Sequence, residues 1–151
     1  MKENPPTKAN VKQCLPFFWV RNIERSLRYY TEGLGFQKAE SWVDEGKIRW
    51  CQLELDDVAI MLQEFWTEGH HNNLPDGKLG VGITIVFLCE DALNLYEQFL
   101  DRGIEVSEPF VGNGMWVVNL TDPDGYQLMF ESKTDLPEEI RLGEWKQGNS
   151  Q

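Results

Sequence analysis

The stretch LTDPDGYQLMFES, residues 120–132, places the turn sequence DPDG, residues 122–125, between two apolar runs. Proline fixes one backbone angle, aspartate bonds to nearby backbone amides, and glycine tolerates left-handed angles, so these residues favour tight turns. The pattern therefore predicts a hairpin whose strands cover residues 115–121 and 126–131. Whether this hairpin belongs to a larger unit depends on the segments that precede it.

Two segments of the chain show the same order of one strand, one helix and three strands. The first segment is predicted to hold strands at 15–20, 36–43, 48–55 and 58–64, with a helix that begins after the cap Asn22 and ends near Gly33 and Gly35. The second is predicted to hold strands at 81–88, 104–107, 115–121 and 126–131, with a helix between the cap Asp91 and Gly103. The apolar faces of the two helices hold Ile23, Leu27, Tyr30 and Leu34, then Ala92, Leu95, Tyr96, Phe99 and Leu100.

The two segments align residue by residue. An offset of 69 relates Asn22 to Asp91, and after the helix an offset of 68 relates Met61 to Met129. Such an internal repeat indicates duplicated structural units. One unit alone leaves a side of its sheet uncovered, so the two units are expected to pack together and enclose a cleft. The predicted fold class is α+β, with two tandem βαβββ modules around a shared cleft.

The predicted modules cover residues 13–64 and 81–132 and form one domain, residues 13–132. A polar linker, residues 65–80, joins them, and residues 1–12 are expected to form a flexible arm. Residues 133–151 are a C-terminal extension. Its apolar residues, expected to pack on the domain or against a partner, are Leu136, Ile140, Leu142 and Trp145.

The composition excludes several classes of partner. The chain of 151 residues carries a formal net charge of −11, which argues against nucleic-acid binding, because that needs a basic face. No apolar run reaches the roughly 18 residues of a membrane span, and the first ten residues lack the apolar stretch of a signal peptide. Cys14, Cys51 and Cys89 form no CxxC pair and are interpreted as reduced thiols of a cytoplasmic protein.

Two stretches, VRNIERSLRYYTEGLGF at 20–36 and DPDGYQLMFE at 122–131, carry a family resemblance together with the repeat between them. They resemble the vicinal oxygen chelate superfamily, which includes glyoxalase I, bleomycin-resistance proteins, fosfomycin-resistance enzymes and extradiol dioxygenases. The resemblance implies that the two βαβββ modules form a partial barrel around the shared cleft. In catalytic members, His, Gln or Glu side chains on the first and fourth strands hold a divalent metal, whereas binding-only members keep the cleft and lack these ligands. One fold hosts many functions, so the site residues decide between them.

The resemblance carries the metal positions of the superfamily onto Leu15, Met61, Thr84 and Met129. A hard or borderline cation binds imidazole and carboxylate groups, which none of these residues supplies. The only histidines, His70 and His71, lie in the linker and would point in opposite directions in an extended segment. The sequence therefore predicts no metal, no cofactor and no catalytic residue.

Strand alternation extends the four positions to a wall of side chains, because residues two apart on a strand share a face. The wall is aromatic and aliphatic with a few polar groups, which suits a flat, partly apolar ligand, and aromatic faces attract organic cations. The alternative is that the aromatic residues are ordinary core. On the third strand of each module, no metal position fixes which alternate residues face the cleft. The assignments of Trp50 with Gln52 and of Trp116 with Val118 therefore rest on weaker grounds. The predicted ligand-binding residues are Leu15, Phe17, Trp19, Trp50, Met61, Gln63, Thr84, Val86, Trp116, Met129 and Glu131.

The favoured hypothesis is a glyoxalase/bleomycin-resistance-like protein that binds a small, partly apolar or cationic molecule in a metal-free cleft and so sequesters an antibiotic. The resemblance implies a homodimer whose clefts use both subunits. Two alternatives stay open. One is a metal-dependent glyoxalase-like lyase, isomerase or dioxygenase, and the other is a binding module for an unknown metabolite.

Overall fold

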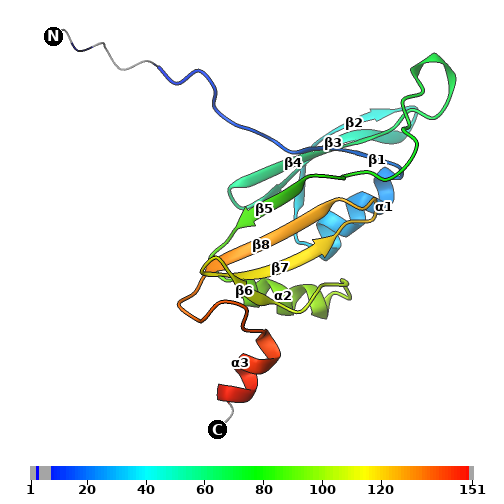
Figure 1. Cartoon of the computed structure of the whole chain (residues 1–151). Helices are drawn as coiled ribbons and strands as arrows, with labels where there is room; N and C mark the ends of the chain where they lie inside the picture. The colour runs from blue at the N-terminus through cyan, green and yellow to red at the C-terminus, as the bar shows by residue number, and fades with distance from the viewer. Residues whose placement is uncertain (1–2, 4–7, 150–151) are drawn as a thin grey trace.

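The computed structural model describes Glu3 and residues 8–149, and its strands form two four-stranded mixed sheets (Figure 1). The first sheet has the order β1-β4-β3-β2, and the second has the order β5-β8-β7-β6. The strands are β1 Phe17–Val20, β2 Gln37–Asp44, β3 Lys47–Leu55, β4 Val58–Glu64, β5 Thr84–Leu88, β6 Phe110–Gly112, β7 Met115–Thr121 and β8 Gln127–Lys133. In each sheet the first strand pairs parallel to the fourth, and the other pairs are antiparallel.

The two predicted helices are present, and the structure adds a 3-10 turn in the linker and a helix in the C-terminal extension. These elements are α1 Ile23–Arg28, which continues as a π-helical turn at Tyr29–Gly33, a 3-10 turn at Gly69–His71, α2 Ala92–Asp101 and α3 Leu142–Asn149. The predicted caps are confirmed, because the side chain of Asn22 accepts from the Arg25 amide and that of Asp91 from the Asn94 amide, both at 3.0 Å. A capped helix that follows the first strand of each sheet therefore recurs in both halves.

The strand registers repeat as the sequence offsets predict. Phe17 pairs with Met61 in the first sheet, and Val86 pairs with Met129 in the second. The helix amides repeat as well, because Glu64 accepts from the Ile23 amide at 3.0 Å and Ser132 from the Ala92 amide at 2.9 Å. The prediction of an α+β fold with two tandem βαβββ modules is confirmed. Below, the first module is the one that holds β1 to β4, and the second holds β5 to β8.

The turn DPDG joins the two modules. Asp122 accepts a hydrogen bond from the Tyr30 hydroxyl at 2.8 Å, and Asp124 accepts from the Ser26 hydroxyl at 3.3 Å. The Tyr126 hydroxyl donates to the backbone oxygen of Trp19 at 2.7 Å. The loop that the sequence identifies as a tight turn thus lies against α1 of the other module, and it fixes one module on the other.

The strand predicted at 104–107 is wrong, because these residues hold no strand and the strand between α2 and β7 is the short β6 at Phe110–Gly112. The Ser107 amide does bond to the Asn119 carbonyl at 3.2 Å, but Pro109, which has no amide hydrogen, interrupts the run. The strand predicted at 81–88 begins only at Thr84, because Gly80 and Gly82 adopt left-handed backbone angles, with φ of 74° and 84°.

The C-terminal extension packs on its own chain. Residues 139–141 run along β6, where the Val111 amide donates to Ile140 and the Glu139 amide donates to Val111. Leu142 is buried, and the ring of Trp145 lies 5.7 Å from that of Trp116. Of the expected N-terminal arm, residues 8–12 hold no helix or strand, and residues 1, 2 and 4–7 lie outside the described residues, as do 150 and 151. No helix in the described part of the chain is long and apolar enough to cross a membrane.

Candidate functional site

The first sheet presents an aromatic face on the side away from α1. Met61 and Gln63 alternate on β4 with Ile60, Leu62 and Glu64, which are buried toward the helix side. The register places Phe17 beside Met61 and both Trp19 and Trp50 beside Gln63, so these side chains share the side that α1 leaves uncovered. We call this surface the first open face. It consists of Phe17, Trp19, Trp50, Met61 and Gln63, together with Trp42, which is described below.

The second sheet presents a related face. Met129 and Glu131 alternate on β8 with the buried Leu128 and Phe130, and Phe130 contacts Phe99 of α2. Val86 lies beside Met129 in the register, and Thr84 lies two residues before it on the same side of β5. The second open face consists of Thr84, Val86, Met129 and Glu131.

Trp116 does not lie on the second open face, so this placement is corrected. It pairs with Ser132, whose side chain bonds to the start of α2, and it is 6% exposed against Trp145. Trp116 is therefore a core residue on the helix side. Leu15 is half-buried and precedes β1, so no strand register fixes the direction of its side chain.

The sequence did not identify Trp42, which belongs to the first open face. It pairs with Trp50 across β2 and β3 and is 46% exposed. A register shift between Trp42 and Val43 interrupts the alternation of β2. Strand alternation could have found Trp42 only together with the register of β2 on β3, which a single sequence does not contain.

The residues at the metal positions do not fit a divalent cation. Met61 and Met129 offer thioethers, which suit soft ions, Thr84 offers a neutral hydroxyl, and Leu15 offers no donor. Within Glu3 and residues 8–149, no three His, Cys, Asp or Glu side chains come together as a possible metal site. Glu131 is the one carboxylate among the residues that define the two open faces, and one carboxylate is too few for a catalytic metal. Glu40 and Glu54 share the side of Trp42 and Trp50, but they belong to no cluster of three such side chains in the described residues.

Both open faces are accessible in a single chain. Phe17 is 38% exposed and Val86 is 46% exposed, although both are apolar. Two hollows, of about 480 and 680 Å³, are lined by none of the predicted ligand-binding residues. The described chain therefore brings the predicted residues together on two faces, apart from Trp116 and Leu15, and whether these residues bind a ligand stays a prediction.

The duplicated module, its register and the two open faces define a two-module βαβββ fold with one methionine on the fourth strand of each module. The chain belongs to the Glyoxalase/Bleomycin resistance protein/Dioxygenase superfamily, whose family model matches residues 11–130. No curated protein matches the chain.

Solved structures show the same fold at low sequence identity. TioX from Micromonospora sp. ML1 is similar with a TM-score of 0.61 and 14% identity, over 80% of this chain and 99% of that one. A glyoxylase/bleomycin resistance protein/dioxygenase domain from Frankia sp. EAN1pec gives 0.64 and 17%, over 84% and 95%. The fosfomycin resistance protein FosX from Mesorhizobium loti gives 0.57 and 14%, over 84% and 96%. At these identities the likeness establishes the fold alone.

Proposed function

We propose that this chain is a small-molecule-binding protein that holds a flat, partly apolar or cationic ligand against its open faces without a metal. The observation that carries the proposal is the composition of the first open face, where Phe17, Trp19 and Trp50 lie beside Met61 and Gln63. Aromatic rings and methionine offer apolar contact area, and glutamine offers a donor and an acceptor to orient the ligand.

The ligand class follows from the charges around the faces. Aromatic rings attract organic cations through their negative faces, and the net charge of −11 draws cations toward the protein over longer distances. Glu131 on the second open face supplies a carboxylate for a positively charged group. Sequestration of an antibiotic in the cytoplasm is the role that fits this chemistry, and the descriptions of the family and of FosX, which name antibiotic resistance, support it.

The complete cleft would form between two copies of the chain. Each copy leaves two partly apolar faces accessible to solvent, and apposing the first open face of one copy with the second of another would enclose a ligand. A homodimer of this kind would bury the exposed rings of Phe17 and Trp42 and the side chain of Val86. It would also explain why the hollows of a single chain lie elsewhere.

The proposal is tested by titrating the protein with metal-free bleomycin and following tryptophan fluorescence. We expect quenching at micromolar ligand, with most of the quenching lost in Trp50→Phe and retained in Trp145→Phe, because Trp145 lies against Trp116 on the helix side. Absence of quenching would remove bleomycin as the ligand. Quenching that survives in Trp50→Phe and disappears in Trp145→Phe would remove the first open face as the site.

Metal analysis of protein purified without a histidine tag tests the main alternative. We expect a substoichiometric content of nickel, zinc and iron, because the four metal positions lack suitable donors. A stoichiometric metal that activates a lyase, isomerase or dioxygenase reaction would replace the proposal with an enzyme of the superfamily. A metabolite-binding module would use the same faces and would differ only in its ligand.

A further inference from the structure

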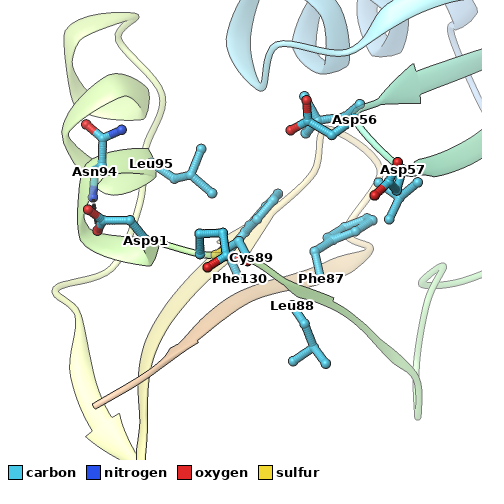
Figure 2. Close-up of a pocket in the computed structure, with 12 residues that line it drawn as sticks. Asp56, Asp57, Phe87, Leu88, Cys89, Asp91, Asn94, Leu95 and Phe130 are labelled. Carbon is cyan, nitrogen blue, oxygen red and sulfur yellow. Dashed lines mark hydrogen bonds between the residues drawn. The ribbon is translucent and has the colours of Figure 1, made fainter.

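A pocket of about 480 Å³ lies where the turn between β3 and β4 approaches the beginning of α2 (Figure 2). Its apolar lining includes Phe87, Phe130 and Leu95, and the volume lies in the range of small-molecule sites. Its polar lining is almost entirely acidic and consists of Asp56 and Asp57 on the turn, Glu90 and Asp91 before α2, and the amide Asn94. None of the residues that define the two open faces lines this pocket. Of the residues that do line it, Leu88 lies on the side of β5 that carries the second open face.

The internal repeat supplies a direct comparison for this pocket. At the equivalent place on the other side of the molecule, the turn DPDG lies against α1, where Asp124 accepts from the Ser26 hydroxyl. Its Asp124 is neutralised there, because Oδ1 lies 3.3 Å from the Arg25 guanidinium and 3.7 Å from that of Arg21. In that contact, an acidic turn of one module meets two cations of the other module.

The cations are missing at the pocket. The offset of 69 relates Arg21 to Glu90 and Arg25 to Asn94, so an acid and a neutral amide stand where the other contact has two arginines. The turn above them is still acidic, with Asp56 and Asp57. Across Glu3 and residues 8–149, no hydrogen bond or ion pair reaches the carboxylates of Asp56, Asp57 or Glu90.

The charges around the pocket are negative, as the comparison of the two modules indicates. Burial raises the pKa of the Cys89 thiol, a hydrogen bond with the Asp91 backbone lowers it in part, and the nearby carboxylates of Asp91, Glu90 and Glu131 raise it. Asp91 accepts from the Asn94 amide at 3.0 Å and so offsets the partial positive charge at the start of α2. Negative charge around an apolar floor is the arrangement that recognises an amine carrying an apolar group.

We propose that this pocket binds an organic ammonium ion with an apolar tail, whose charge takes the place of the two arginines of the equivalent contact. The ammonium group lies between the turn at Asp56 and Asp57 and the carboxylate of Glu90, and the tail packs on Phe87 and Leu95. This site is separate from the open faces, so it does not depend on the proposed function.

The test uses 4-phenylbutylammonium as the probe and 4-phenylbutanol as its uncharged analogue. Backbone amide NMR of the labelled protein should show shifts concentrated at Cys89, Asn94 and Leu95 with the ammonium probe, and the alcohol should bind at least about tenfold more weakly. The double variant Asp57→Asn/Glu90→Gln should weaken ammonium binding about tenfold. Asp135→Asn, an exposed acid outside the pocket, is the matched control and should leave it unchanged.

A second double variant recreates the equivalent contact. Glu90→Arg/Asn94→Arg places arginines opposite the acidic turn, so we expect a raised Tm and loss of ammonium binding. Equal binding of the alcohol and the ammonium ion would overturn the proposal, as would shifts confined to the open faces. Binding that survives both double variants would overturn it as well. Trp50→Phe should leave this binding intact, so a failure here and a failure of bleomycin binding are distinguishable.

Discussion

Asp122 is a carboxyl group whose burial is part of the contact between the modules. It is 4% exposed, and besides the Tyr30 hydroxyl it accepts from the backbone amides of Asp124 and Tyr126, both at 2.9 Å. Burial raises the pKa of Asp122, and the hydrogen bond from Tyr30 and those from the amides lower it only in part. The folded protein therefore holds a proton on Asp122 more tightly than the unfolded chain does.

This raised pKa predicts a pH dependence of stability. The stabilisation from Asp122 is fully present below about pH 4, the ordinary pKa of aspartate, and is lost as the pH rises through the higher pKa of the folded state. We expect the free energy of unfolding of the wild type to fall relative to that of Asp122→Asn as the pH rises above 4. Urea unfolding over a series of pH values measures this difference, and Asp135→Asn should show none. A difference that does not change with pH would contradict the prediction.

The hydroxyl of Tyr30 gives a second test of the same contact. Tyr30→Phe removes the hydrogen bond to Asp122 and should lower the free energy of unfolding by about 1.5–3 kcal/mol, as for buried hydrogen bonds to charged groups. Tyr29→Phe is the matched control, because its hydroxyl donates to the Thr121 carbonyl at 3.4 Å near the surface. Chemical unfolding at neutral pH measures both, and an equal loss in the two variants would show that the buried contact contributes nothing particular.

At the scale of single residues, the sequence predicts the side of the sheet on which a side chain lies only where the repeat relates that strand to a known position. Met61 and Met129 were related by the repeat, and their neighbours Phe17, Gln63 and Val86 lie on the faces that alternation predicts. Trp116 lay on a strand without such a position. Its side was settled by pairing with Ser132, a long-range contact that alternation alone does not contain.

At the scale of elements, α3 acts as a cover on the second module. Trp145 packs on Trp116, and Leu142 is buried beside the edge strand β6. Trp145→Ala should lower the free energy of unfolding by about 1–3 kcal/mol, through lost apolar burial and the lost ring contact. Thermal or urea unfolding measures the change. Lys146→Ala is the control, because its ion pair with Glu97 is exposed and should contribute little. An unchanged stability in Trp145→Ala would mean that α3 does not contribute to the fold.

The elements with caps and regular periodicity could be predicted from the sequence, and the irregular ones could not. Asn22 and Asp91 mark the helix starts because their side chains bond to amides three residues on, which is a local effect. The short strand β6 depends on pairing with β7 and on residues 139–141 beside it, which are distant in sequence. Residues 104–107 form no strand, and β6 instead takes the place in the second sheet that β2 has in the first.

At the scale of the molecule, the repeat predicts the two modules but not how they meet. The turn DPDG has the sequence of any tight turn, and nothing in it indicates the contacts of Asp122 and Asp124 with α1. The contact at α1 and the pocket at α2 differ at aligned positions such as Arg21 and Glu90. The sequence offset aligns these positions but does not indicate which side chains they face. Duplication therefore fixes the shared fold, and the differences between the copies create the sites.

The two open faces predict a self-association that can be measured. Apposition of the first open face with the second face of another copy removes Val86, which is 46% exposed, from water. We expect a dimer in sedimentation velocity at micromolar concentration, and Val86→Asp should shift it to monomer, because a buried and unpaired carboxylate opposes association. Leu100→Asp is the matched control, since Leu100 is 44% exposed on α2, outside both faces. A wild type that stays monomeric, or a Val86→Asp variant that stays dimeric, would contradict a dimer formed through these faces. A dimer that Leu100→Asp disrupts and Val86→Asp preserves would instead move the interface to the helix side.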